Sequence, residues 1–270
     1  MELNHNIKMR VFTKYIIIAL LAFCPFASAF GQKTVSLRVM SMNIRQGGEY
    51  AGHKSQPYSD LIKQYNPDVI ALQEVDYKTL RNGRRDWLNE VAMQTGMFPY
   101  FCKSITYQDG GFGVALLSKY PFYKCEKTVF VHDDTREDRA TGWIYVQLPS
   151  GETVRVGAVH LSLETSQLTI QHFATINKAF FAEDTTTPAL MIGDYNADKG
   201  SDPINYVKNK WMDVIPDMGK TIPTSGPTRQ LDWVMGYPKG AWKCTKHEVL
   251  ARTDMSDHCF IVADVELTIE

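Results

Sequence analysis

Short apolar runs, each long enough for a single β-strand, recur along most of the chain and constrain its fold more than any other feature. The runs are rich in β-branched and aromatic residues, and turn-forming stretches such as Pro149-Ser150-Gly151 separate them. They span Val35–Ile44, Asp68–Val75, Phe112–Ser118, Gly142–Leu148, Val154–Leu161, Ala189–Ile192, Leu231–Met235 and His258–Leu267. Helical spacing is found in Ser59–Tyr65, Arg85–Thr95 and Ser166–Glu183. Because strands outnumber helices, the sequence predicts packed sheets with helices outside them.

The composition fits one globular domain. The chain has 270 residues, of which 44% are apolar and 22% charged, and this balance excludes disordered, coiled-coil and fibrous proteins. There is no low-complexity linker and no repeat at the periods of solenoid proteins. We therefore expect a single domain over residues 30–270.

The first 29 residues have the order of a secretory signal peptide. Basic residues lead into the apolar run Tyr15–Phe26, and the small residues Ala27-Ser28-Ala29 follow it. A transmembrane helix needs about 20 apolar residues, whereas this run is shorter and contains Pro25. We therefore predict a signal peptide over residues 1–29, export to the periplasm or the medium, and no transmembrane segment in the mature chain. Lipid attachment at Cys24 is less favoured, because bulky Phe23 precedes the cysteine.

The charge of the mature chain does not resemble that of a duplex-DNA binder. Residues 1–29 contain three of the 29 basic residues and one of the 30 acidic residues, so 26 basic and 29 acidic residues remain, a net charge of −3. Duplex binders rely on clustered Lys and Arg to neutralise phosphates. The only dense basic cluster is Arg81–Arg85 with Lys78. We expect weak duplex binding and a monomer.

Four cysteines remain in the mature chain: Cys102, Cys125, Cys244 and Cys259. None forms a CxxC pair, so a structural zinc site is not indicated. Cys102 and Cys125 lie in neighbouring strand-like segments, and export permits disulfides. A Cys102–Cys125 disulfide and free buried thiols are both compatible with the sequence.

Polar residues stand at the ends of the apolar runs. Four runs end at Asn43, Glu74, His160 or Asp194, and two begin near Asp232 or His258. A single Asp or Asn at such a position is usually a turn former. Together, however, these residues supply oxygen ligands for a cation and histidines beside carboxylates for proton transfer. The pattern therefore indicates a catalytic site.

Four motifs resemble those of the endonuclease/exonuclease/phosphatase superfamily, which has the deoxyribonuclease I-like fold. They are Asn43, Leu72-Gln73-Glu74-Val75, Gly193-Asp194-Tyr195-Asn196-Ala197 and Ser256-Asp257-His258, and their order and spacing also match. The similarity runs from Val35 to Ile269. It implies an α/β (α+β) fold, a four-layer sandwich of two packed mixed β-sheets flanked by helices, and a metal-dependent phosphoric ester hydrolase.

The resemblance also implies a set of metal ligands. Asn43 and Glu74 match the metal-binding asparagine and glutamate of the superfamily, and Asp257 matches an acidic residue that can also face the metal. These oxygen donors suit Mg²⁺ or Mn²⁺ and argue against Zn²⁺, which prefers His and Cys.

The same resemblance implies roles in proton transfer. His258 matches the histidine that activates water or stabilises the phosphorane, and Asp232 matches the carboxylate that orients it. A buried carboxylate fixes the tautomer of its histidine and raises its basicity. Asp194 matches an aspartate that is assigned either as the general base or as a proton shuttle. Which of His258 and Asp194 activates water stays open.

Three further residues match positions that contact the substrate phosphate or the leaving group. His160 would protonate the leaving oxygen, Asn196 would donate a hydrogen bond to a phosphoryl oxygen, and Arg139 would reach the substrate phosphate. Two departures are modest: Tyr195 replaces a common phenylalanine, and Val159 precedes His160 where many members have threonine. Neither removes a catalytic group.

The sequence thus predicts an exported, divalent-metal-dependent phosphoesterase in which water attacks in line. Lipid, sugar-phosphate and nucleic-acid substrates are all compatible with the superfamily, and the net charge slightly favours a small or lipid-borne phosphoester. The alternatives are a secreted deoxyribonuclease I-like nuclease and, more remotely, a non-catalytic binding domain on the same fold.

Overall fold

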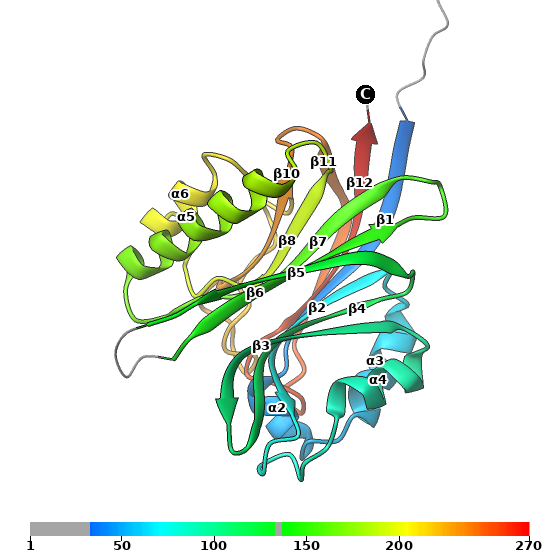
Figure 1. Cartoon of the computed structure of the whole chain (residues 1–270), viewed down its shortest axis with the longest axis vertical. Helices are drawn as coiled ribbons and strands as arrows, with labels where there is room; N and C mark the ends of the chain where they lie inside the picture. The colour runs from blue at the N-terminus through cyan, green and yellow to red at the C-terminus, as the bar shows by residue number, and fades with distance from the viewer. Residues whose placement is uncertain (1–32, 133–136, 270) are drawn as a thin grey trace, which may run out of the picture. The chain divides into compact units, whose positions relative to one another are not determined.

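A computed structural model describes residues 33–132 and 137–269. The expected signal peptide, residues 1–29, lies outside the described residues and stays a prediction. In the described part, the strands form two six-stranded sheets (Figure 1). The first sheet has the order β11 (Trp242–Leu250), β12 (Phe260–Ile269), β1 (Lys33–Asn43), β2 (Val69–Tyr77), β4 (Gly110–Ser118), β3 (Phe98–Tyr107). The second has the order β5 (Phe122–Phe130), β6 (Arg139–Gln147), β7 (Thr153–His160), β8 (Ala189–Asp194), β10 (Asp232–Tyr237), β9 (Met212–Asp213).

Helices cover the outer faces of the sheets, and three apolar clusters hold the layers together. The described helical segments are α2 (Arg45–Gly48), the 3₁₀ turn η1 (Glu49–Ala51), α3 (Gln56–Tyr65), α4 (Trp87–Thr95), α5 (Ser166–Glu183) and α6 (Asp202–Val207). One cluster, which includes Val39 and Ile144, fills the space between the sheets. A second joins α3 and α4 to the first sheet, and a third joins α5 and α6 to the second. The predicted four-layer sandwich is confirmed (Figure 1).

The central strands read as continuous apolar runs because both of their faces are buried. In β1, Val39 packs between the sheets while its neighbour Met40 faces the helices. Successive side chains of a strand point to opposite faces, so a strand with helices on one side and a sheet on the other needs apolar residues throughout.

Helix α5 begins and ends at the residues predicted from its spacing. Thr165 caps its N-terminus by accepting a hydrogen bond from the Leu168 backbone N–H. Phe173, Ile176 and Phe180 form its buried stripe against the second sheet.

Each sheet contains a parallel pair of strands whose carboxyl ends carry predicted site residues. In the first sheet β1 pairs with β2, and Asn43 lies opposite Gln73, next to Glu74. In the second sheet β7 pairs with β8, and His160 lies opposite Asp194. Carboxyl ends of parallel strands meet at one edge of a sheet, where ligands commonly bind. The topology therefore brings these residues to the same end of the sandwich.

Two sequence-based expectations concern smaller features. Cys102, Cys125, Cys244 and Cys259 are all free thiols, so of the two alternatives left open the structure has the free cysteines. Within residues 33–132 and 137–269, no helix is long and apolar enough to cross a lipid bilayer.

Candidate active site

The predicted site residues meet around one cavity of about 590 Å³. Most of them line it directly: Glu74, Arg139, His160, Asp194, Asn196, Asp257 and His258. Asn43 and Asp232 are buried immediately behind them, each 1% exposed. The structure thus assembles all nine predicted residues in one place, although they come from segments up to 215 positions apart, between Asn43 and His258.

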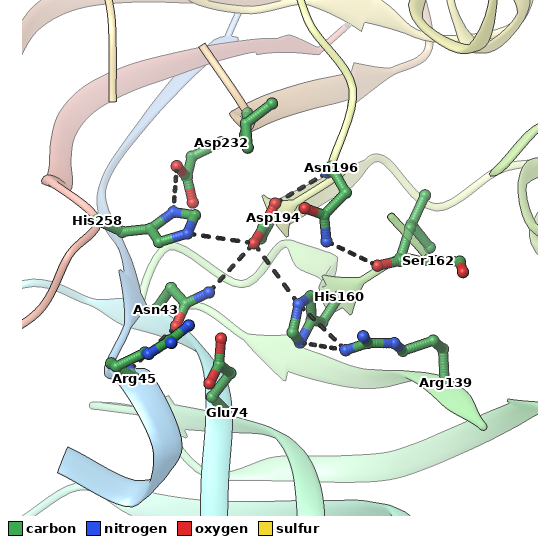
Figure 2. Close-up of polar contacts among 12 residues, drawn as sticks. Asn43, Arg45, Glu74, Arg139, His160, Ser162, Asp194, Asn196, Asp232 and His258 are labelled. Atoms are coloured by element: carbon green, nitrogen blue, oxygen red, sulfur yellow. Dashed lines mark hydrogen bonds and ion pairs between the residues drawn. The ribbon is translucent and has the colours of Figure 1, made fainter. Parts of the chain in front are cut away.

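Asp194 lies at the centre of the polar network (Figure 2). In the second sheet it stands opposite His160 on β7 and opposite Asp232 on β10. Its Oδ2 is 3.1 Å from Asn43 Nδ2 and 3.6 Å from Nε2 of both His160 and His258. Burial raises the pKa of Asp194, while the charge of His258 opposes the shift.

His258 is held between two carboxylates. Its Nδ1 lies 2.9 Å from Asp232 Oδ2, and its Nε2 faces Asp194 (Figure 2). Burial alone lowers the pKa of this histidine, but Asp232 and Asp194 outweigh burial and raise it. The predicted pairing of His258 with Asp232 is therefore present, and it fixes the orientation of the ring.

His160 has the opposite electrostatic environment. Nη1 of Arg139 lies 3.1 Å from its Nδ1 and 3.2 Å from its Nε2. Burial lowers the pKa of His160 well below its usual value, and the positive charges of Arg139 and His258 lower it further. His160 is thus a neutral imidazole at neutral pH, and Arg139 points into the site rather than into solvent (Figure 2).

Glu74 stands on an irregular turn of β2. The register between β2 and β4 shifts between Leu72 and Val75, and Glu74 itself has a φ of 61°. This bulge turns the side chain into the cavity, where Oε2 accepts a hydrogen bond from the Gln46 backbone N–H at 2.8 Å. Glu74 is 9% exposed, and no described cationic side chain forms an ion pair with it. Buried carboxylates are normally paired with a cation.

The donor atoms around Glu74 fit a hard divalent cation. Asn43 Oδ1 accepts one hydrogen bond, from the Arg45 backbone N–H at 3.1 Å, and retains a second lone pair. Asp257 lines the same cavity, with Oδ2 3.4 Å from Arg45 Nη1. Carboxylate and amide oxygens are the ligands that Mg²⁺ prefers.

A second group of ligand-type atoms belongs to Asp194, Asp232 and His258, which lie within 4.8 Å of one another. Here the His258 ring stands between the two carboxylates and bonds Asp232 through Nδ1. The imidazolium of His258 therefore supplies one positive charge between the two carboxylates, which raise its pKa. The trio therefore has the geometry of a histidine held between two carboxylates, whereas the oxygen donors around Glu74 have the chemistry of a cation site.

The Gly193-Asp194-Tyr195-Asn196 motif has a separate physical reason for each residue. A Cβ on Gly193 would lie 2.1 Å from the Val159 carbonyl oxygen, so only glycine permits the close approach of β7 and β8. Tyr195 is fully buried, and its hydroxyl donates to the Met191 carbonyl oxygen at 2.9 Å. Asn196 has a φ of 50° and donates through Nδ2 to the Leu161 carbonyl oxygen at 2.9 Å. Gly193 and Tyr195 of the motif therefore serve packing of the second sheet, whereas Asp194 and Asn196 line the cavity.

Three further arginines line the cavity: Arg45, Arg81 and Arg229. The sequence reasoning noted Arg81 only within the basic cluster Arg81–Arg85 and missed the other two. Each has an acidic partner, at 3.4 Å for Arg45 and Asp257, 2.7 Å for Arg81 and Asp76, and 2.8 Å for Arg229 and Asp198. Arg45 follows Asn43 closely, and the two glycines after Gln46 hint at the left-handed turn that carries it, with φ of 51° at Arg45. No local signal marks Arg229.

A family model described as the Endonuclease/Exonuclease/phosphatase family matches residues 40–258. The chain belongs to this family. Enzymes of the family hydrolyse phosphoester bonds, so the chain is a phosphoester hydrolase, and such enzymes generally depend on a divalent metal. A comparison with curated proteins finds no match.

Solved structures share the fold of this family member at low sequence identity. A family protein of Bacteroides thetaiotaomicron is 13% identical, with 88% of this chain and 100% of that chain covered and a TM-score of 0.74. The mannosyl-6-phosphatase of the same organism is 14% identical, with 85% and 99% covered and a TM-score of 0.70. A humanized TDP2 of D. rerio is 14% identical, with 85% and 98% covered and a TM-score of 0.64.

Proposed function

We propose that this family member is an exported hydrolase of small or lipid-borne phosphoesters that requires Mg²⁺ or Mn²⁺. The observation that carries the proposal is the shared environment of Asp194, whose carboxylate faces Asn43, His160 and His258 within 3.6 Å. A carboxylate between two imidazoles, beside a glutamate without a cationic partner among the described side chains, would combine proton transfer with binding of a cation. Phosphoryl transfer needs both, because positioning and charge stabilisation supply nearly all of its acceleration.

Different residues of the chain would bind the phosphoryl group and transfer protons during its hydrolysis. Arg139, Asn196 and the neutral ring of His160 supply hydrogen-bond donors for the phosphoryl and leaving oxygens. His258, held by Asp232, and the neighbouring Asp194 are the two groups placed beside the attacking water. The Asp194 carboxylate can accept a proton directly, whereas His258, whose pKa is raised, accepts one only after it has released its own. His160 lies across Asp194 from His258, which suits action on the leaving oxygen opposite the water.

Asn43, Glu74 and Asp257 would hold the metal ion. When bound, the ion supplies Lewis-acid stabilisation of the negative charge that grows on the phosphoryl and leaving oxygens.

The balance of charge in the cavity supports a substrate with few phosphates. Arg45, Arg81 and Arg229 each face an aspartate, and Arg139 lies 3.1 Å from Glu137. The cavity therefore offers little uncompensated positive charge for a polyanion. A mannosyl-6-phosphatase among the structural neighbours is consistent with a small phosphoester, although it shares only the fold.

Export rests on the sequence of residues 1–29, which has the order of a signal peptide. We propose that the mature protein begins near residue 30, is periplasmic or secreted, and is a monomer. Amino-terminal sequencing of the protein recovered from an expressing cell tests the cleavage, and its mass in solution tests the monomer.

Chelation of the purified protein tests the function. We expect excess chelator to abolish phosphoester hydrolysis while the circular dichroism spectrum stays unchanged, because the cation contributes to the transition state and little to the core. Mg²⁺ or Mn²⁺ should restore activity. Full activity in chelator, or restoration by Zn²⁺ alone, would contradict the assignment of Asn43 and Glu74.

A substrate panel separates the proposal from the secreted nuclease. Duplex DNA, RNA, a sphingomyelin-type lipid and sugar phosphates would be compared by kcat/KM at one salt concentration. We expect a small or lipid-borne ester to be best. Duplex DNA as the best substrate would replace the proposed substrate class and leave the roles of the site residues unchanged.

A further inference from the structure

The cavity extends past the groups that face the phosphate, along a wall built from the β3–β4 hairpin and the loop after β2. Its residues, which we call the hairpin wall, are Arg81, Ile105, Tyr107 and Phe112. The guanidinium carbon of Arg81 lies 4.7 Å from the ring centroid of Tyr107 and 5.1 Å from that of Phe112. None of these residues has a role in the proposed chemistry.

Arg81 in this wall is not available as a second phosphate receptor. Its Nε and Nη2 donate to the two carboxylate oxygens of Asp76 at 2.7 and 2.9 Å, and its Nη1 donates to Gln46 Oε1 at 3.0 Å. Asp76 is 1% exposed, so the pair is neutral and fixed. Glu137 lines the same cavity and adds negative charge. A second phosphate would be repelled here rather than bound.

Contacts within the hairpin and to the end of β2 hold the hairpin wall in place. Gln108 accepts from the Arg81 backbone N–H at 2.8 Å and donates to the Tyr107 hydroxyl at 3.4 Å. At the start of β4, a Cβ on Gly110 would lie 2.4 Å from the Tyr77 carbonyl oxygen, so the hairpin sits directly on the end of β2. Pre-organisation of this kind lowers the entropy that a ligand must lose on binding.

The exposed part of the wall suits a flat, uncharged group. Tyr107 is 37% exposed, and Ile105 presents an aliphatic side chain beside it. Aromatic side chains stack on flat rings without requiring a charge on the ligand. Leu163 and Ile222 add apolar surface elsewhere in the cavity.

We propose that the hairpin wall binds the alcohol portion of the substrate, and that this portion is an uncharged ring with a flat face. The inference rests on the proposed function, because it assigns the phosphoryl group to the Glu74 and His258 end of the cavity. An aromatic ring and a pyranose sugar share this chemistry, and the experiment distinguishes them. Tyr107 is then a residue that determines specificity without acting in catalysis.

Binding of phosphonates, which are not hydrolysed, tests the inference independently of activity. Calorimetry in Mg²⁺ would compare phenylphosphonate, a hexose 6-phosphonate and methylphosphonate on the full mature chain. We expect at least one ring compound to bind about tenfold more tightly than methylphosphonate, within the range that ring stacking contributes. The ring compound with the larger gain in affinity over methylphosphonate shows whether the wall binds an aromatic ring or a pyranose sugar.

Substitutions of Tyr107 test whether the hairpin wall causes the higher affinity for a ring compound. Tyr107→Ala should weaken the preferred ring compound about tenfold and leave methylphosphonate within about twofold, whereas Tyr107→Phe should retain the preference. Tyr123→Ala is the matched control, because Tyr123 is 66% exposed on β5 and does not line the cavity. In hydrolysis, Tyr107→Ala should raise KM for the ring ester with little change in kcat, whereas Tyr107→Phe and Tyr123→Ala should keep the wild-type KM.

Three results would overturn the inference: equal affinity for ring and methyl phosphonates, equal weakening of both by Tyr107→Ala, or a preference for a hexose bisphosphate that Arg81→Met removes. Failure of the proposed function looks different. In that case no phosphate ester is hydrolysed in Mg²⁺ or Mn²⁺, while the phosphonate affinities still report on the hairpin wall.

Discussion

The first sheet delivers Asn43, Glu74, Asp257 and His258 to the cavity, whereas the second delivers Arg139, His160, Asp194, Asn196 and Asp232. Oxygen donors for a cation come from the first sheet, next to backbone with positive φ at Arg45 and Glu74. Groups that contact each other directly in the strand register, His160, Asp194 and Asp232, come from the second. Irregular backbone thus orients Glu74, a proposed metal ligand, whereas regular strand pairing places His160, Asp194 and Asp232, which are proposed for proton transfer.

The two histidines show what this difference causes. His258, from the first sheet, lies between two carboxylates of the second, and its pKa is raised despite burial. His160, within the second sheet, lies beside Arg139, and burial together with that charge lowers its pKa. The same residue type therefore carries a proton on one side of Asp194 and none on the other at neutral pH.

The largest expected effect comes from removing either histidine. His258→Ala and His160→Ala should each lower kcat by on the order of 10²–10⁴, the range for a positioned acid or base. Steady-state kinetics on the best substrate measures this, and His247→Ala on the exposed strand β11 is the control. A loss of tenfold or less in His258→Ala would transfer water activation to Asp194.

Removing the charge of Glu74 should affect metal binding more than chemistry. Glu74→Gln is expected to raise the Mg²⁺ concentration needed for half-maximal activity by about tenfold or more, because the charge of the ligands sets the affinity for hard cations. Titration calorimetry with Mn²⁺ gives the affinity directly. Glu49→Gln, in the exposed turn η1, should behave as wild type. An unchanged affinity in Glu74→Gln would place the cation on the second sheet.

The dependence of kcat/KM on salt concentration tests how many substrate phosphates the cavity contacts. Few contacts are expected, because its arginines are already paired with acidic residues. With two phosphates contacted or fewer, log(kcat/KM) should fall with log[salt] at a slope no steeper than about −1.8, which is a loss of about tenfold or less between 50 and 200 mM. A duplex nuclease with about six contacts would lose roughly a thousandfold over the same range. Measurement of kcat/KM at several salt concentrations decides between them.

The smallest expected effects are on stability in chelator, where the two histidines should act with opposite sign. The raised pKa of His258 stabilises the fold below its unfolded value of about 6.5, and this contribution is lost as pH rises through the folded pKa. The lowered pKa of His160 gives stability above about 6.5 that is lost as pH falls.

Urea unfolding of His258→Gln and His160→Gln at pH 5.5 and 9 measures this difference. His258→Gln should destabilise the protein more at the lower pH, and His160→Gln more at the higher. The change between the two pH values should exceed about 1 kcal/mol, which roughly one unit of pKa difference produces. Parallel profiles for the two variants would show that the two sides of Asp194 are electrostatically alike.

The four strands without a predicted range are those at the edges of the sheets, β3, β11, β5 and β9. The sequence indicated β3 and β5 only as the strand-like segments around Cys102 and Cys125. In β3 only Cys102 is buried, and in β5 only Phe130. An edge strand with one solvated face has no continuous apolar run, and β9 has only two residues. The central strands were predictable because a strand that is buried on both faces consists of a continuous run of apolar residues.

The sequence by itself was enough to predict the sandwich and the family, because strand periodicity, residue type and motif order are local properties of the chain. It also predicted nine site residues, which the fold brings to one cavity. Tertiary structure alone decided how these residues are charged and paired. The opposite pKa shifts of His258 and His160, the fixing of Arg81 by Asp76 and Gln46, and the free thiols of Cys102 and Cys125 depend on distances between segments far apart in sequence. Coulomb energies and desolvation follow those distances and the burial around them, which no short stretch of sequence encodes.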